Sequence, residues 1–167
     1  MTITVGSCIP DITVQTMGAN GPEDLSTGSL FAGRTVVLFG LPGAFTPTCS
    51  NAHVPGFVVQ ADALKAAGVD TIACMSVNDA FVMHAWGQSQ NAEQLLMIAD
   101  GNADFATAMG LEMDLRARGF GIRCQRFAAV VEDGVVRYLG VEPAPGLTVS
   151  SAESVLAFLK DSGTADA

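Results

Sequence analysis

The chain has 167 residues, of which 49% are hydrophobic and 15% are charged. These values are typical of a globular protein with a sizeable core, and they exclude an intrinsically disordered chain. The formal net charge of −9 argues against a surface that binds nucleic-acid phosphates. No apolar stretch reaches the roughly 18 residues that a membrane-spanning helix needs. We find no internal repeat or linker, and we expect one domain over residues 1–167.

The cysteine content and the N-terminal charge both favour a reducing compartment. The first basic residue is Arg34, so the start of the chain lacks the positive charge of a signal or transit peptide. We therefore expect a cytoplasmic protein. The four cysteines, Cys8, Cys49, Cys74 and Cys124, are irregularly spaced, which favours free thiols over disulfides. The absence of a Cys-x-x-Cys pair argues against a structural zinc site and against a thioredoxin-type dithiol.

The first half of the chain predicts short strands followed by a strand–helix–strand unit. Residues 3–5 and 12–15 are strand-like pieces between turns rich in glycine, proline and asparagine. Residues 34–41 are apolar enough for a strand that is buried on both faces, as in a parallel sheet. An amphipathic helix follows to about Ala67, and residues 71–77 form a second buried strand.

The second half of the chain continues this alternation. A helix capped by Asn78 or Asp79 comes first, followed by a strand over 95–99 and a short helix over Asp104–Met109. Residues 111–122 form a connection to which we assign no structure. Strands over 126–132 and Val135–Val141 are joined by a turn at Asp133-Gly134, and a last helix begins at Ser151. Residues 161–167 are expected to fray. This order predicts an α/β fold with a central mixed β-sheet flanked by helices.

The segment that joins the first buried strand to its helix carries the strongest chemical signal. Residues 42–49 read Pro-Gly-Ala-Phe-Thr-Pro-Thr-Cys, and with Thr46 as the N-cap and Pro47 as the first helical residue, Cys49 is the third. A helix start presents unpaired N–H groups and a partial positive charge. A thiol there ionises more readily than a free cysteine, and the thiolate is the reactive form. We predict that Cys49 is an activated nucleophile.

Three neighbours of Cys49 complete the predicted pocket. Thr46 and Cys49 are one helical turn apart, so the hydroxyl and the sulfur face the same space. We expect the Thr46 hydroxyl both to cap the helix and to donate towards the thiolate or a bound oxygen. Pro42 and Phe45 are expected to wall the pocket with apolar surface.

The pattern Pro42-x-x-x-Thr46-x-x-Cys49 resembles the active-site signature of the peroxiredoxins, which reduce hydroperoxides with a peroxidatic cysteine. The wider sequence is similar to the type II subgroup (Prx5). The matching segments follow in order over about residues 3–160, and they include His53-Val-Pro-Gly-Phe57, the run from Cys74 to Val82, Trp86-Gly87 and Arg126-Phe-Ala128.

The resemblance implies a thioredoxin-like fold and the thiol-dependent reduction of hydrogen peroxide and organic hydroperoxides, with no metal or organic cofactor. It also implies that an arginine from a distant strand approaches the peroxidatic sulfur, and Arg126 is the matching position. A guanidinium there favours thiolate and holds the peroxide oxygens in line. Cys49 would attack the O–O bond and become a sulfenic acid, which a thiol then reduces. The resemblance further implies a homodimer.

The chain departs from the type II pattern at the cysteine that resolves the sulfenic acid. Some members carry it in a Gly-Leu-Thr-Cys segment, but residues 146–149 here read Gly-Leu-Thr-Val. Cys74 lies in an apolar strand and is expected to be a core residue, and Cys124 is disfavoured as a resolving thiol although Arg123 and Arg126 lie close in sequence. We predict a one-cysteine mechanism with glutathione, glutaredoxin or thioredoxin as the reductant. Resolution by Cys74 or Cys124 is the alternative.

Several polar residues have a structural explanation beside a functional one. His53 is expected to pack or to form surface hydrogen bonds; a Cys–His pair with Cys49 or a metal site is the alternative. His84 is expected to be an ordinary helix residue. Arg116, Arg118 and Arg123 are expected to be solvated. The alternative is that they form a basic cluster with Arg126 that attracts an anionic thiol such as glutathione.

The aromatic residues and the overall function also leave alternatives open. Phe45, Phe81 and Phe120 either fill the core or lie near the dimer contact that the resembled family forms. A thiol–disulfide reductase would need a dithiol motif that is missing. A non-catalytic thiol redox sensor or a chaperone-like binding protein would keep a reactive cysteine but would need neither Thr46 nor Arg126.

Overall fold

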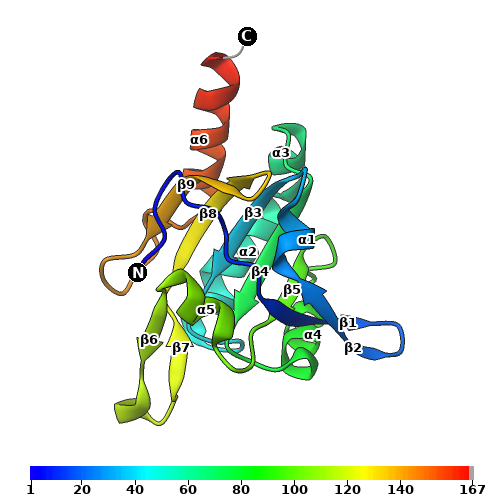
Figure 1. The fold of residues 1–167 in the computed structure, drawn as a ribbon, viewed down its shortest axis with the longest axis vertical. Helices are drawn as coiled ribbons and strands as arrows, with labels where there is room; N and C mark the ends of the chain where they lie inside the picture. The colour runs from blue at the N-terminus through cyan, green and yellow to red at the C-terminus, as the bar shows by residue number, and fades with distance from the viewer. Residues whose placement is uncertain (166–167) are drawn as a thin grey trace.

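A computed structural model describes residues 1–165, and its centre is a seven-stranded mixed β-sheet with the spatial order β2-β1-β5-β4-β3-β8-β9 (Figure 1). The predicted central mixed sheet is therefore confirmed. The inner strands β3, β4 and β5 run parallel to one another, whereas β8 and β1 join them antiparallel. The strands of this sheet are β1 (Thr13–Gly18), β2 (Gly21–Ser26), β3 (Thr35–Gly40), β4 (Thr71–Ser76), β5 (Leu96–Ala99), β8 (Phe127–Glu132) and β9 (Val135–Val141).

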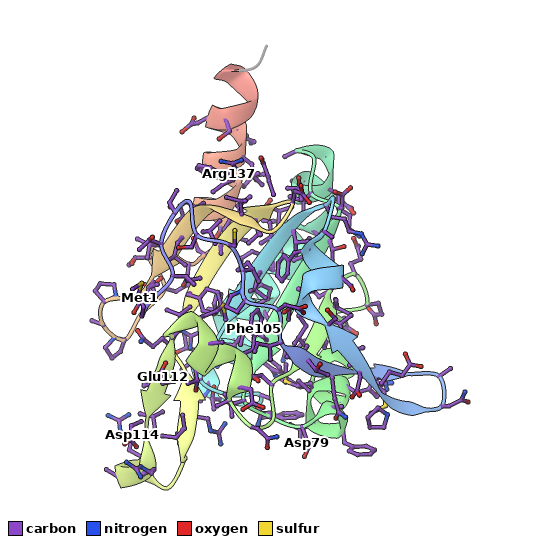
Figure 2. All side chains as sticks on the ribbon, in the orientation of Figure 1. Met1, Asp79, Phe105, Glu112, Asp114 and Arg137 are labelled. Carbon is purple, nitrogen blue, oxygen red and sulfur yellow. The ribbon has the colours of Figure 1, made fainter. Side chains whose placement is uncertain are left out.

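Helices cover both faces of the sheet (Figure 1). One face carries α2 (Val54–Val59), α3 (Ala61–Ala66), α4 (Ala80–Ser89) and α6 (Ala152–Ala165), whose buried residues pack in one apolar cluster. The opposite face carries α1 (Thr27–Phe31) and α5 (Asp104–Met109), which pack in a second cluster. Figure 2 shows Phe105 of α5 over the middle of this second face. Among residues 1–165, no helix combines the length and the apolar character needed to cross a bilayer.

Strand β3 shows why the sheet is buried on both sides. Successive side chains of a strand point to opposite faces. Val37 and Phe39 accordingly pack in the first cluster, whereas Val36 and Leu38 pack in the second, and all four are fully buried. The segment that carries Cys49 follows directly after β3.

The hairpin between β8 and β9 forms at the predicted turn. Asp133 and Gly134 both have positive φ, 47° and 79°, as a two-residue turn of the primed type requires. Glycine adopts this conformation without a Cβ penalty, and aspartate tolerates it better than most residues. This hairpin aligns the end of β9 beside Arg126, the residue just before β8, because the Glu142 N–H donates to the Arg126 carbonyl at 3.0 Å.

The N-terminal part of the chain differs from the prediction. Residues 3–5 do not form a strand; Ile3 is buried, and its N–H donates to the Met109 carbonyl at 2.9 Å. The segment Gly21–Ser26 forms the edge strand β2, although its glycine, proline and acidic residues do not predict one. An edge strand tolerates proline because one row of its backbone groups needs no partner in the sheet.

The predicted helix up to Ala67 is interrupted. Pro47 and Thr48 begin the helix, Cys49–His53 then forms a π-helical turn (η1), and the helix is interrupted again at Gln60 between α2 and α3. The prediction of one continuous helix was wrong, and the π-helical turn contains Cys49.

Residues 111–122, left without a predicted structure, contribute to a projecting arm (lower left in Figure 1). Strands β6 (Glu112–Asp114) and β7 (Ile122–Cys124) pair antiparallel, with a short 3₁₀ turn, η2 (Arg116–Arg118), at the tip. Figure 2 shows Glu112 and Asp114 on this arm. Two glycines with positive φ, Gly119 and Gly121, reverse the chain there.

The last helix is longer than expected. α6 runs to Ala165, so residues 161–165 are helical where fraying was predicted. Residues 166 and 167, which the same prediction covered, lie outside the described residues.

Candidate active site

Cys49 lies in the first turn of the helix that follows β3, as its sequence position predicts. Helical structure begins at Pro47, and the Ser50 N–H donates to the Thr46 carbonyl at 2.9 Å. Thr46 therefore stands at the N-cap and Cys49 at the third helical position. The Cys49 side chain is fully buried, with none of its surface exposed.

The Thr46 hydroxyl makes a different hydrogen bond from the one expected. It donates to the Gly43 carbonyl at 2.7 Å, within its own loop. A hydroxyl has one proton and two lone pairs, so this bond uses its donor and leaves acceptor capacity facing the site. The expectation that Thr46 donates towards the thiolate or a bound oxygen was wrong for this conformation, because the proton is committed to Gly43.

A π-helical turn contains both Cys49 and His53. The Val54 N–H donates to the Cys49 carbonyl, five residues back instead of four. Proline has no N–H and its ring clashes with the carbonyl four residues before it, so Pro55 disfavours a regular α-helix at this point. π-Helical turns of this kind are frequent at functional sites. Pro55 was the sequence signal for this irregularity.

Arg126 contacts the sulfur of Cys49. Its Nη2 donates to Cys49 Sγ at 3.1 Å, although the two residues are 77 positions apart in sequence. The other terminal nitrogen, Nη1, donates to His53 Nδ1 at 2.8 Å. The guanidinium thus joins two residues of one helix, and it brings together the cysteine and the arginine that the sequence resemblance paired.

His53 is buried, and its two ring nitrogens have different partners. Nε2 lies 2.8 Å from the Ser150 carbonyl, which can only accept, so Nε2 carries the proton. Nδ1 is then the acceptor of the Arg126 bond. Burial, followed by the nearby Arg126 charge, lowers the pKa of His53 from 6.5 to about 3, so the ring is neutral at physiological pH. His53 forms buried rather than surface hydrogen bonds, and its link to Arg126 was not predicted.

Two residues outside the motif hold the loop that precedes Cys49. Asn78 Oδ1 accepts from the Ala44 N–H at 3.0 Å and from the Ser76 hydroxyl at 2.7 Å. The adjacent Asp79, and not Asn78, caps α4, because its Oδ1 accepts from the Val82 N–H at 2.8 Å.

Arg123 holds the same loop from the other side. Its Nη1 donates to the Pro42 carbonyl at 3.2 Å, and its Nε donates to the Phe120 carbonyl at 2.8 Å. The prediction that Arg123 is simply solvated was wrong. It links the projecting arm to the active-site loop, whereas Arg116 stays exposed and pairs with Asp114.

An open pocket of about 460 Å³ lies next to this network. Its lining includes Pro42, Thr46 and Arg126, and also apolar side chains of the projecting arm such as Met113 and Phe120. Pro42 therefore lines the pocket as expected. Phe45 does not fulfil its predicted role there: it is 57% exposed and its ring centroid lies 6.4 Å from that of Trp86.

Comparison with known proteins assigns this arrangement to a family. Residues 4–156 match the Redoxin family model. Peroxiredoxin-2D of Arabidopsis thaliana is 47% identical over 156 residues, which cover 92% of this chain and 96% of the relative. The chain belongs to the redoxin family and, within it, to the peroxiredoxins. Peroxiredoxins are thiol-dependent peroxidases, so the chain is an oxidoreductase of this class.

Solved peroxiredoxin structures share the fold over nearly the whole chain. Reduced Prx3 of Vibrio vulnificus in complex with hydrogen peroxide has a TM-score of 0.92 and 52% identity, with 95% of this chain and 99% of that chain covered. A 1-Cys peroxiredoxin, the Plasmodium falciparum antioxidant protein, has a TM-score of 0.88 and 29% identity, with 95% and 99% covered. The predicted thioredoxin-like fold and peroxiredoxin resemblance are confirmed.

The remaining cysteines of this peroxiredoxin are free thiols, and two of them are fully buried. Cys74 on β4 and Cys124 on β7 have none of their surface exposed. Burial raises the pKa of each thiol well above its usual range. A buried neutral thiol is a poor nucleophile. Cys8 is exposed, at the isolated bridge to Val135.

Other candidate residues lie on the surface. His84 is exposed on α4, as an ordinary helix residue would be. Phe81 and Phe120 are 66% and 45% exposed, so neither of them, nor Phe45, fills the core. The alternative that these three phenylalanines fill the core is therefore wrong.

Proposed function

We propose that Cys49 is the peroxidatic nucleophile of this thiol-dependent peroxidase, with Arg126, Thr46 and Pro42 forming its site. The observation that carries the proposal is the 3.1 Å contact between Arg126 Nη2 and Cys49 Sγ. A charge-assisted donor of this kind stabilises a thiolate and the charge that develops on peroxide oxygen. The position of Cys49 in the first turn of a helix adds N–H groups that favour the same negative charge.

The first step transfers one oxygen to sulfur. The Cys49 thiolate attacks one oxygen of the hydroperoxide, an S–O bond forms, and the O–O bond breaks. Sulfur is oxidised by two electrons to the sulfenate level, and the second oxygen leaves with the bonding pair and takes up a proton as water or an alcohol. The acceptor lone pairs of the Thr46 hydroxyl suit a peroxide O–H, because the Thr46 proton is donated to Gly43.

The second step is reduction by an external thiol, which makes this a one-cysteine enzyme. A first thiol displaces water from the Cys49 sulfenic acid and forms a mixed disulfide, and a second thiol releases Cys49 and the reductant's disulfide. The proposal is supported by the raised pKa values that burial gives the thiols of Cys74 and Cys124, and by valine at position 149. Glutathione, glutaredoxin or thioredoxin is the reductant that we propose. Four free thiols also fit a reducing compartment, and we propose the cytoplasm.

We also propose a homodimer that buries the exposed phenylalanines near α4. Phe81 lies in the first turn of α4, and Phe45 lies against Trp86 of the same helix. Two exposed aromatic side chains beside one helix are typical of the centre of a protein–protein contact. Sedimentation of the wild-type protein and of Phe81→Glu tests this: we expect a dimer that the variant dissociates. A monomeric wild-type protein would contradict it.

Stopped-flow oxidation by hydrogen peroxide and by an organic hydroperoxide tests the role of the site. Trp86, the chain's single tryptophan, donates to Ser50 Oγ at 2.9 Å, beside Cys49, so its fluorescence can report oxidation. We expect Cys49→Ser to abolish the reaction and Arg126→Gln to slow it by roughly a hundred-fold. A redox sensor or binding protein that needs no Arg126 would react equally fast in both wild type and Arg126→Gln.

A further inference from the structure

We propose that Glu142 is a positioning residue for the reaction at Cys49. It fixes the orientation of the Arg126 guanidinium through residues 148–150 and through His53. This inference rests on the proposed function, because it concerns the arginine that acts on the peroxide. Glu142 itself touches neither Cys49 nor the Arg126 guanidinium among the contacts of residues 1–165.

The Glu142 carboxylate holds the 148–150 loop by five hydrogen bonds. Its Oε2 accepts from the N–H groups of Thr148, Val149 and Ser150 at 2.9, 2.9 and 2.8 Å, and from the Ser150 hydroxyl at 2.7 Å. Its Oε1 accepts from the Thr148 hydroxyl at 2.6 Å. Three successive backbone N–H groups that converge on one oxygen form an anion-binding concavity.

The ionised form of Glu142 suits these donors. Burial acts to raise the pKa of Glu142, but the hydrogen bonds from Thr148 and Ser150 outweigh it and lower the pKa from 4.5 to about 2. The carboxylate is therefore charged throughout the physiological range. Hydrogen bonds to a charged acceptor are roughly twice as strong as neutral ones, so they stabilise the loop conformation in which all five are made.

The 148–150 loop in turn places the Ser150 carbonyl within hydrogen-bond distance of His53. Ser150 is buried, and both its N–H and its hydroxyl are bonded to Glu142. Its carbonyl accepts from His53 Nε2 at 2.8 Å. The carbonyls of Thr148 and Val149 are also occupied, by the Ser154 and Tyr138 hydroxyls. The position of the Ser150 carbonyl is thus set by the loop conformation that Glu142 stabilises.

The orientation of the His53 ring determines where the Arg126 guanidinium can donate. Because Nε2–H is held by Ser150, Nδ1 is fixed as an acceptor, and Arg126 Nη1 donates to it at 2.8 Å. The Glu142 N–H also donates to the Arg126 carbonyl at 3.0 Å. Glu142 therefore acts on both ends of Arg126: directly on its backbone, and through Ser150 and His53 on its guanidinium.

This indirect arrangement has a chemical advantage for the peroxidase reaction. Within residues 1–165, no carboxylate forms an ion pair with Arg126. A carboxylate bonded to the guanidinium would orient it but would also offset its positive charge. Neutral His53 orients the guanidinium and leaves its charge for the Cys49 sulfur and the peroxide. Glu142 lines the same pocket as Arg126, and it supplies rigidity through its bonds to residues 148–150.

A double-mutant cycle tests the proposed route. We expect Glu142→Ala to slow oxidation of Cys49 by hydrogen peroxide roughly ten- to a hundred-fold, as a misplaced catalytic group does. In a His53→Leu background, whose side chain can neither accept from Arg126 nor donate to Ser150, Glu142→Ala should slow the reaction by a further factor of less than about three. If the rate reductions of the two single variants simply multiply in the double variant, Glu142 acts independently of His53 and the proposal is overturned.

Matched variants separate positioning from general stability. Glu132→Ala removes an exposed glutamate at the end of β8, whose weak pair with Arg137 spans 3.5 Å, and it should react within about twofold of wild type. Glu142→Gln keeps an acceptor oxygen for the loop and presents an amide to the Thr148 hydroxyl, which can accept. It should restore the rate to within about fivefold of wild type. A folded Glu142→Gln as slow as Glu142→Ala would contradict the geometric route.

The outcomes for this inference and for the proposed function are distinct. A wild-type protein that hydrogen peroxide does not oxidise at Cys49 contradicts the proposed function. A reactive wild type with an equally reactive, folded Glu142→Ala contradicts the positioning role alone. If Glu142→Ala does not fold, Glu142→Asp, whose carboxylate is one methylene shorter, takes its place in the cycle with the same expected non-additivity.

Discussion

Arg126 and His53 share a hydrogen bond of 2.8 Å in which the arginine donates to Nδ1. The bond exists only while His53 is neutral, because a protonated ring has no acceptor nitrogen. The Ser150 carbonyl and the Arg126 charge both act on this ring, and burial with the Arg126 charge keeps it neutral at physiological pH. The relationship therefore links the orientation of the arginine to the ionisation of a histidine that does no chemistry itself.

The first prediction concerns stability against pH. The pKa of His53 is about 3 in the folded protein and 6.5 ordinarily, so below pH 6.5 the unfolded chain binds more protons and stability falls as the pH drops towards 3. The depressed pKa of Glu142 acts only below about 4.5. Between pH 6.5 and 4.5, wild type should lose about 2 kcal/mol more unfolding free energy than His53→Gln. Chemical denaturation at both pH values measures this, and parallel losses would contradict it.

The second prediction concerns the Thr46 hydroxyl. Thr46→Val keeps the shape of the side chain but removes the bond to the Gly43 carbonyl, so we expect about 1 kcal/mol lower stability. The variant also loses an acceptor for the peroxide, and its oxidation by hydrogen peroxide should be at least about tenfold slower. Thr46→Ser retains the hydroxyl and should stay within about threefold of wild type. Equal rates for valine and serine would show that the hydroxyl has no role in the reaction.

The third prediction concerns Asn78 and its neighbour Asp79. Asn78→Ala leaves the Ala44 N–H without its acceptor, which should cost about 1–3 kcal/mol and slow the peroxide reaction by loosening the loop before Cys49. Asp79→Ala removes the cap of α4 at a comparable cost of about 1 kcal/mol, but it leaves that loop bond intact. Thermal unfolding together with stopped-flow kinetics separates the two. A reaction slowed equally in both variants would mean that stability, and not loop geometry, limits the rate.

The fourth prediction concerns resolution of the sulfenic acid. After one equivalent of hydrogen peroxide, intact-mass analysis and trapping with a sulfenic-acid reagent should place one oxygen on Cys49. Cys74 and Cys124 should stay reduced, since burial raises the pKa of each thiol, and of the cysteines in residues 1–165 only Cys49 accepts a hydrogen bond from Arg126. The double variant Cys74→Ala, Cys124→Ala should turn over with glutathione at the wild-type rate. A Cys49–Cys74 or Cys49–Cys124 disulfide as the main product would contradict the one-cysteine mechanism.

The sequence was sufficient for the framework because its signals are local. The apolar run before Cys49, the Asp133-Gly134 turn and the helix-start position of Cys49 each follow from residues close together in the chain. Where local preference and tertiary packing disagreed, the prediction failed. Residues 3–5 have strand-like composition, but Ile3 instead packs beside α5, and β2 forms from a segment of poor strand formers because β1 offers it a partner.

The polar support of the site depends on contacts between distant residues, which a single sequence does not specify. His53 and Ser150 are 97 positions apart, and Arg123 and Pro42 are 81 apart. Glu142 carried no local signal, because six to eight residues separate it from Thr148 and Ser150, more than the roughly two to four positions that local side-chain hydrogen bonds span. Its connection to Arg126 also required the fold, because Glu142 follows β9 whereas His53 lies in the π-helical turn after β3.

The most direct test of the account compares stopped-flow oxidation by hydrogen peroxide in the wild type, Cys49→Ser and Arg126→Gln, with alkylation of Cys49 by iodoacetamide as a second reaction. Arg126 contacts the sulfur and is proposed to bind the peroxide oxygens, so its loss should slow peroxide oxidation by roughly a hundred-fold and slow alkylation far less. Cys49→Ser should react with neither reagent at this position. Equal slowing of both reactions in Arg126→Gln, or a peroxide rate equal to that of the wild type, would contradict the central claim that this arginine stabilises the breaking O–O bond.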